Sequence, residues 1–497
     1  MGKRKPARPR GMAYSRDEGN VDWDEEKQTL GKSERRRICV RAMVCAVGHV
    51  WLFALLGLCA AAVNAPKLLA EPAGAVSVSG QTESSGPAAA ESVEKTQQRV
   101  TGEYRLSRDR YEKAVALSRA EYRLYFISVA WGFAALLLVL RLKVVARLRD
   151  FAEGRTGSRW LQAVIFVPAL LGLLALLHLP LRAYGHTLAV RFDLSVQGWG
   201  SWMWDWTKGE FLTIGLAIVV ARLLFAVIRW KPRTWWLYFW LAAVPLALFL
   251  FFISPWFVDP LFNKFVPLQQ NHPELVESIG KLTQRAGVPI PAERMFLMEA
   301  SAKTNALNAY VTGIGASKRV VIWDTTIAKT KSDELLVIVG HELGHYVLGH
   351  LAIGFAAYLA GLLLGLYVTF HALQWILGRW GGVWGVRGQE DWAALAVLLL
   401  IMSVLGFVSM PVGNGFSRMQ EHAADVYGLE VVHGLVANSQ EAGARTEQVM
   451  GEADLADPKP SRFIVFWLYS HPPQAERQEF AYTYDPWSKG EAPKYVK

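Results

Sequence analysis

The chain has 497 residues, of which 52% are hydrophobic and only 19% are charged, and it contains 20 tryptophans. This balance is typical of a membrane protein and excludes an ordinary set of soluble domains. The formal net charge of +10 is concentrated in the N-terminal tail and at loop ends, as in KRKPARPR and RLKVVARLR. Charge of this kind is usual beside membrane spans, so we expect no nucleic-acid partner.

The three cysteines, Cys39, Cys45 and Cys59, all lie in or beside the first apolar segment. They exclude a disulfide framework and a cysteine-based zinc site elsewhere in the chain. Any metal site must therefore use histidine and carboxylate ligands.

The first 124 residues divide into three parts. Residues 1–41 are polar and basic, without apolar periodicity, and predict a disordered tail. Residues 42–63 form a predicted membrane span, for which a cleaved secretory signal peptide is the alternative interpretation. Residues 64–124 comprise a linker rich in Ala, Ser and Gly, followed by a helix at the membrane surface.

Seven segments approach the roughly 20 apolar residues that an α-helix needs to cross a bilayer core of about 30 Å. The predicted fold class is therefore an α-helical membrane protein with seven transmembrane helices. Arg222 lies inside the fourth segment, where a charge is costly unless it faces a cavity or a partner. The predicted spans are Ala42–Val63, Tyr125–Leu140, Trp160–Pro180, Phe211–Ile228, Trp235–Phe257, Leu351–Leu377 and Trp392–Met410.

A polar insertion, residues 263–350, separates spans 2–5 (residues 125–262) from spans 6 and 7 (residues 351–410). Pro273 and Gly287 suit the first position and the C-terminal cap of a helix. Three β-rich runs follow, RMFLMEAS, NAYVTGI and RVVIWDTTI, and Ser332 then opens a second helix. The insertion is predicted to be a small α+β unit, and residues 411–497 form a C-terminal segment.

This second helix carries His341, Glu342 and His345 in the pattern H-E-x-x-H. Residues four apart lie within about 40° of each other around a helix, so the two imidazoles can bind one ion. A carboxylate at Glu342 lies near such an ion and can move a proton from a zinc-activated water to the departing amine. Two histidines and a glutamate on an apolar helix are costly unless something satisfies them, so zinc is favoured over a chance match.

The third ligand decides the class of zinc site. His350 falls one position away from the third histidine of the long metzincin pattern and points away from the His341 face, so we expect it at the membrane interface or in a loop. The stretch GFSRMQEHAADVYG offers Glu421 and Asp425 on one helical face. Glu421 completes a site of two histidines and one glutamate that is open to water. Asp425 accepts a hydrogen bond from a ligand imidazole, and His422 is structural.

Together, GHELGHYVLGH, SRMQEHAAD, NAYVTGIGASKRVVIWDTT and SHPPQAER resemble the type I CaaX prenyl endopeptidases, a family of integral-membrane zinc metalloproteases. SPWFVDPLFNKFVPL and FDLSVQGWGSWMWD agree with this resemblance. It implies seven helices that enclose a water-filled chamber, with one Zn²⁺ per chain facing inward. The implied ligands are His341, His345 and Glu421, with Glu342 as general base and acid.

The same resemblance gives roles to residues outside these two helices. Asn308 and Ala309, in NAYVTG, match an edge strand that pairs with an extended substrate backbone by β-strand addition. His471, in SHPP, matches a histidine near the zinc that stabilises the tetrahedral oxyanion. Arg418 and Arg477 match structural ion-pair partners.

Two other classes fit less well. Intramembrane site-2-type proteases take their third ligand from an Asp-Gly element, and this chain contains no Asp-Gly dipeptide. A transporter or lipid-handling protein built on an inactive protease scaffold would be expected to lack Glu342 or a ligand, and neither is missing.

The sequence leaves substrate and orientation open. Expected partners are the lipid bilayer and a peptide or membrane-protein substrate, for CaaX-type processing or for quality control of membrane proteins. We expect a monomer in a bacterial inner membrane or an equivalent membrane. Basic loops place the zinc site outside the cytoplasm by the positive-inside rule, whereas the resemblance implies a cytosolic catalytic face.

Overall fold

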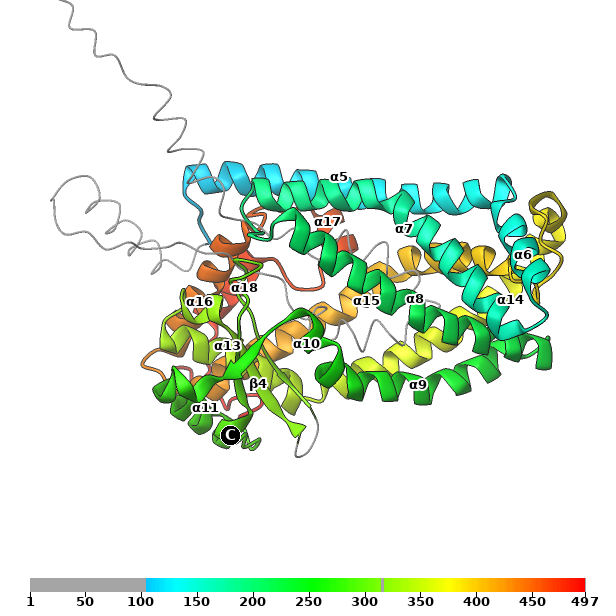
Figure 1. Ribbon diagram of the computed structural model, residues 1–497. Coiled ribbons are helices and arrows are strands. Elements are labelled where there is room, and N and C mark those ends of the chain that lie inside the picture. The colour runs from blue at the N-terminus through cyan, green and yellow to red at the C-terminus, as the bar shows by residue number, and fades with distance from the viewer. Residues whose placement is uncertain (1–103, 314–316, 497) are drawn as a thin grey trace, which may run out of the picture.

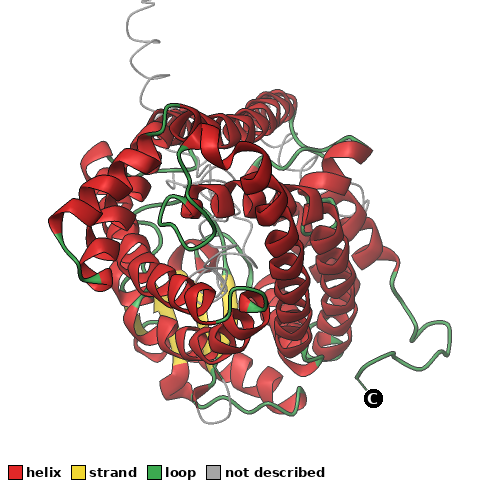
Figure 2. Ribbon diagram, turned by 90° about the vertical axis from the view of Figure 1, so that its right-hand side faces the viewer, coloured by secondary structure: helices red, strands yellow, loops and turns green. Residues whose placement is uncertain are grey.

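The computed structural model describes residues 104–313 and 317–496 of the chain. The predicted tail, the first span and most of the linker, residues 1–103, lie outside these described residues. Within them, long helices form a bundle that extends away from a smaller unit of strands and short helices (Figure 1). Figure 2 looks along the bundle toward the strands and shows helices around its outside.

Five helices of the described part are long and apolar enough to cross a membrane. They are α5 (Arg108–Arg141), α7 (Arg159–Arg191), α8 (Trp199–Trp230), α14 (His350–Trp384) and α15 (Ala394–Val432). Another helix, α9 (Trp235–Phe257), contains a shorter apolar stretch, Trp235–Leu250. The protein is therefore an integral-membrane helical protein, and the total of seven spans stays a prediction.

Several helix boundaries differ from the predicted ones. The surface helix expected before residue 125 and the second span are one continuous helix, α5. Helix α7 passes through Pro168 and Pro180, and α15 passes through Pro411 and continues to Val432. Proline is tolerated in membrane helices because neighbouring groups satisfy the freed carbonyls. Helix α15 therefore joins the membrane part of the chain directly to the stretch that carries the predicted third ligand.

Large apolar side chains fill the core of the bundle. Phe166, Phe225, Trp235 and Trp392 are fully buried and come from α7, α8, α9 and the segment before α15. In a membrane, where the lipid tails are also apolar, such side chains stabilise the bundle mainly through van der Waals packing between the helices. Besides the two helices that pack on the strands, described below, the shorter helices of the described part are α6 (Val144–Arg155), α10 (Asp259–Phe262), α12 (Asp324–Ile327), α16 (Ser439–Asp454), α17 (Arg462–Leu468) and α18 (Gln474–Thr483), with 3-10 turns η2 (Leu268–Gln270) and η3 (Ala292–Arg294).

Four short strands form one mixed sheet, in the order β1-β2-β4-β3. Strands β2 and β4 are parallel, whereas β1 and β3 pair antiparallel with their neighbours. The strands are β1 (Phe265–Pro267), β2 (Met295–Met298), β3 (Ala309–Thr312) and β4 (Arg319–Trp323). Strand β3 is therefore an edge of this sheet.

Two helices, α11 (Pro273–Arg285) and α13 (Ser332–Val347), share an apolar core with this sheet. The helix predicted between Pro273 and Gly287 is confirmed, and Gly287 has the positive φ of 68° that favours glycine after a helix. Packing on the sheet holds α13 in position beside the membrane-capable helix α15.

Candidate active site

Three glycines let α13 and α15 cross in close contact. A Cβ atom on Gly428 of α15 would lie 3.0 Å from the backbone N of His341. Cβ atoms on Gly340 and Gly344 of α13 would meet side chains of α15 at 3.0 Å and 3.1 Å. Small residues permit such close approach of helix backbones. The crossing therefore places His341 directly against the second half of α15.

This crossing brings together His341, His345 and Glu421, whose ligand atoms all lie within 4.8 Å of one another. Nε2 of His341 is 3.1 Å from Nε2 of His345. Oε2 of the buried Glu421 is 3.2 Å from the first nitrogen and 3.5 Å from the second. We call these three residues the His-His-Glu cluster.

The cluster fits a zinc ion. Asp425 Oδ1 lies 2.8 Å from Nδ1 of His341, so the carboxylate favours a proton on this nitrogen, which leaves the lone pair of Nε2 to face the cluster. Within the described residues, the buried Oε2 of Glu421 has no well-aligned hydrogen-bond donor. A cation satisfies lone pairs that converge in this way, and two nitrogens with one oxygen are ligands that catalytic zinc accepts.

The electrostatics of the cluster agree with this fit. Burial alone lowers the pKa of His341, but the carboxylates of Asp425 and Glu421 outweigh burial and raise this pKa to about 10. Burial also raises the pKa of Glu342, against the opposing effect of the neighbouring histidines. The site therefore attracts positive charge, and Glu342 holds a proton more readily than an exposed glutamate does.

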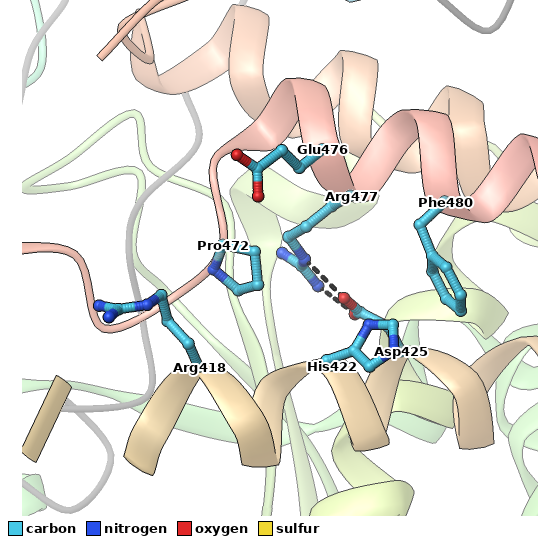
Figure 3. Close-up of a pocket in the computed structure, with 7 residues that line it drawn as sticks. All are labelled: Arg418, His422, Asp425, Pro472, Glu476, Arg477 and Phe480. Atoms are coloured by element: carbon cyan, nitrogen blue, oxygen red, sulfur yellow. Dashed lines mark hydrogen bonds and ion pairs between the residues drawn. The ribbon is translucent and has the colours of Figure 1, made fainter. Parts of the chain in front are cut away.

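A chain of buried charges fixes Asp425. Arg477 of α18 donates to both of its oxygens, from Nε at 3.0 Å and from Nη2 at 2.5 Å (Figure 3). Nη1 of Arg477 is 3.1 Å from Oε2 of Glu447 on α16. A bidentate pair of this kind holds a carboxylate in one orientation, so Asp425 stays aimed at His341. Glu447 is not predicted from the sequence, because it belongs to no motif and lies on a separate helix.

Arg418 does not form the ion pair expected of it. Its Nη1 donates to the backbone carbonyl oxygens of Val465 and Tyr469, at 3.0 Å and 2.5 Å. In the part of the chain that the structure describes, no carboxylate lies within ion-pair distance of it. Arg418 therefore joins α15 to the backbone of α17 and of the residue that follows it.

A pocket of about 380 Å³ opens beside Asp425 and not among the three clustered residues. It is lined by Arg418, His422, Asp425, Pro472, Glu476, Arg477 and Phe480 (Figure 3). The ring of His422 lies 4.6 Å from that of Phe480, as a structural histidine would. The two histidines of the cluster do not line this pocket, and neither do Asn308 and Ala309, the residues predicted to bind substrate.

Two further histidines lie against the cluster. His471, in the loop between α17 and α18, places Nε2 3.2 Å from Oε2 of Glu421. His350 places Nδ1 3.0 Å from Nδ1 of His345. The expectation that His350 lies away from the site is wrong, because Gly349, with a positive φ of 69°, turns the chain between α13 and α14.

The two residues predicted to bind substrate lie at the start of the edge strand β3. Ala309 pairs with Ile322 of β4. The carbonyl oxygen of Asn308 accepts from the backbone N of Trp323 and therefore faces β4. Since neighbouring residues alternate in an antiparallel ladder, the N–H and C=O of Ala309 face the open edge of the sheet. Strand β3 also contacts α13, which carries the two histidines of the cluster.

Fold and site together define a class of protein. Membrane-capable helices and a His-His-Glu cluster beside a buried glutamate describe an integral-membrane metallopeptidase. Two family models match the chain. Peptidase family M48 matches residues 269–483, and the CAAX prenyl protease N-terminal model, with five membrane helices, matches residues 91–264.

Individual proteins agree with these matches. The uncharacterized metalloprotease YhfN of Bacillus subtilis is 37% identical over 372 residues, which cover 74% of this chain and 85% of that protein. A CAAX prenyl protease 1 homolog of Dictyostelium discoideum is 37% identical over 139 residues, or 28% of this chain and 32% of that protein. The crystal structure of S. mikatae Ste24p has the same fold, with a TM-score of 0.64 and 20% identity over 89% of this chain and 99% of that chain. The chain belongs to peptidase family M48, among the homologues of the CAAX prenyl proteases.

Proposed function

We propose that this chain is a zinc metalloendopeptidase that holds one zinc ion per chain through His341, His345 and Glu421. The observation that carries the proposal is the convergence of these side chains from two helices, beside the buried Glu342. When bound, zinc supplies a Lewis acid that makes water more acidic and polarises a carbonyl group.

Residues of the chain supply the remaining chemistry. Glu342 accepts the proton of the attacking water and passes it to the departing amine, and a raised pKa suits both transfers. Asp425 keeps His341 in the tautomer that leaves Nε2 free. His471 stabilises the oxyanion that forms when the substrate carbonyl is attacked.

The proposed substrate is an extended peptide that adds to the open edge of β3 at Asn308 and Ala309. Main-chain hydrogen bonds of this kind bind peptides largely regardless of sequence. The similarity to CAAX prenyl protease 1 homologs supports processing of CaaX-type C-terminal peptides. Sequence-independent binding supports a second role, quality control of membrane proteins.

The proposed architecture is a monomer with seven spans around a chamber into which the zinc site faces. It lies in a bacterial inner membrane or an equivalent membrane. The fold match to Ste24p over most of this chain supports the helical fold in this proposal. Seven spans require two segments besides the five long helices. These are residues 42–63, which lie outside the described residues, and α9, whose apolar stretch is shorter.

The test measures hydrolysis of a quenched, membrane-compatible peptide together with zinc per chain. Glu342→Gln keeps the size of the side chain but cannot accept the proton. We expect cleavage to fall about 10²- to 10⁴-fold while zinc content stays at the parent level. If the variant cleaves like the parent, this site is not the catalytic centre. A parent that binds zinc but cleaves nothing would favour the alternative, an inactive protease scaffold with a transport or lipid-handling function.

A further inference from the structure

A group of arginines lies at the end of the bundle opposite the His-His-Glu cluster. Arg159 begins α7, while Arg222 and Arg229 lie seven residues apart on the C-terminal part of α8 and so share one helix face. Figure 1 shows this end, near α6, far from α13 and α16. The charges of Arg159 and Arg222 are both close enough to Arg229 to repel its charge.

The carboxylates nearest to this end are engaged by other arginines. Asp391 Oδ2 lies 2.5 Å from Nη1 of Arg149, and both side chains are buried. Asp150 and Glu153 each lie 2.7 Å from the guanidinium group of Arg387. These carboxylates therefore have partners on α6 and on the loop before α15.

Arg222 and Arg229 have no carboxylate within 4 Å in the described part of the chain. There, Nε of Arg222 and Nη1 of Arg229 are buried and have no hydrogen-bond partner. Glu390, exposed on the adjoining loop, attracts Arg229 only from a greater distance. Arg159 is balanced in part by Glu153, 3.5 Å away. Two positive charges on a membrane-capable helix thus lack a counter-charge from these residues.

Tryptophans hold the two guanidinium groups in place. Cζ of Arg222 lies 5.3 Å from the ring centre of Trp160, and Cζ of Arg229 lies 5.8 Å from that of Trp392. Nε1 of Trp392 donates to the buried Gln162 of α7. Such cation–π contacts orient a guanidinium group but do not neutralise its charge.

The surface beside these arginines is apolar. Trp160, Leu161 and Val164 of α7 and Val219 of α8 are 46% to 53% exposed. Both helices are able to cross a membrane. Acyl chains can cover these side chains while a headgroup lies at the helix ends.

We propose that Arg222 and Arg229, together with Arg159, bind the phosphate of an anionic phospholipid. A charge inside a membrane segment is costly without a partner, and guanidinium groups bind phosphate oxygens through paired hydrogen bonds. Basic pockets between membrane helices are a known form of site for anionic headgroups. The adjoining apolar surface selects a lipid over free phosphate.

The test titrates the delipidated full chain, in a non-ionic detergent, with phosphatidylglycerol, phosphatidylcholine or inorganic phosphate. Bound lipid per chain is counted by native mass spectrometry. We expect saturable binding of phosphatidylglycerol, at least about tenfold tighter than phosphatidylcholine, and no displacement by inorganic phosphate. The double variant R222Q/R229Q should bind phosphatidylglycerol at least about tenfold more weakly.

The matched control is R141Q/R233Q, which removes two charges from exposed positions at the same end of the bundle. It should bind phosphatidylglycerol like the parent, and both double variants should keep zinc and peptide cleavage. Equal lipid binding by the two double variants would overturn the proposal, as would displacement of the lipid by inorganic phosphate. If R222Q/R229Q does not fold, the single variant R229Q is compared with the control instead. We expect it to bind phosphatidylglycerol about fivefold more weakly.

Discussion

Arginines at the two ends of the bundle differ in their partners. Beside the His-His-Glu cluster, Arg477 lies between two carboxylates of the chain, Asp425 and Glu447. At the opposite end, Arg222 and Arg229 lie over aromatic rings and have no carboxylate within 4 Å among the described residues.

The difference reflects what each end must do. A metal site needs its imidazoles held in one orientation, which rigid carboxylate and guanidinium partners provide. An end that lies near the membrane surface can leave charge for lipid headgroups, which are anionic and abundant there. Arg477 beside the His-His-Glu cluster is therefore neutralised by carboxylates of the chain, whereas Arg222 and Arg229, at the end that we propose to bind lipid, have no carboxylate within 4 Å among the described residues.

A bulky residue at the crossing of α13 and α15 should disrupt the His-His-Glu cluster. Gly428→Val places a branched side chain against the backbone of His341, where even a Cβ would lie 3.0 Å from N. Overpacking costs about 1–3 kcal/mol, so we expect zinc affinity and peptide cleavage to fall about tenfold or more. Gly413→Val on the same helix is the control, since a Cβ there meets nothing within 4 Å. Equal zinc affinity in the two variants would contradict the close crossing.

The end of the bundle that holds Arg222 and Arg229 also contains a paired arginine, Arg149, so paired and unpaired charges can be compared there. Arg149→Leu leaves the buried Asp391 without its arginine partner, and breaking such an ion pair costs about 3–5 kcal/mol. Arg222→Leu removes a charge that has no carboxylate partner among the described residues, so its effect in lipid-free detergent should be much smaller. Melting temperatures measure both effects. Equal decreases would show that Arg222 has a structural role.

The open edge of β3 gives a prediction about substrate alone. Ala309→Pro removes an N–H that faces away from β4, which is the donor that an added peptide strand would use. We expect kcat/KM to fall about tenfold, as for one or two lost hydrogen bonds, with zinc content unchanged. Ala309→Ser keeps the N–H and should cleave like the parent. If both variants cleave like the parent, peptide does not bind at this strand.

The smallest expected effect concerns pH. Burial raises the pKa of Glu447 from 4.5 to about 7. A raised carboxyl pKa contributes stability that is present below pH 4.5 and is lost as pH rises through about 7. The melting temperature of Glu447→Gln, loaded with zinc, should therefore vary less between pH 5 and pH 8 than that of the parent. Parallel curves for the two proteins would show that Glu447 does not titrate in this range.

Local spacing predicted which residues the structure brings together in the candidate site. Helix α13 carries His341 and His345 on one of its faces, and helix α15 carries Glu421 and Asp425 on one of its own. Each pair is four residues apart, so the shared face follows from the helical repeat alone. The structure brings three of these residues within 4.8 Å of one another and puts Asp425 against His341. The resemblance to a known family was needed to select His471.

Contacts between distant segments could not be predicted from spacing. The contact between Arg477 and Glu447 joins two helices that no motif links. The approach of His350 depends on the backbone conformation of Gly349. Helix lengths were also underestimated, because proline ends helices in water but is tolerated inside the long helix α15.

The most direct test of a site built from two helices is the zinc content of Glu421→Ala. This variant removes the carboxylate that α15 contributes, whereas Glu342→Gln leaves all three proposed ligands in place. After dialysis against a weak chelator, we expect one zinc per chain in the parent and in Glu342→Gln, and strongly reduced zinc in Glu421→Ala. If Glu421→Ala keeps as much zinc as the parent, α15 supplies no ligand and the two-helix site is contradicted.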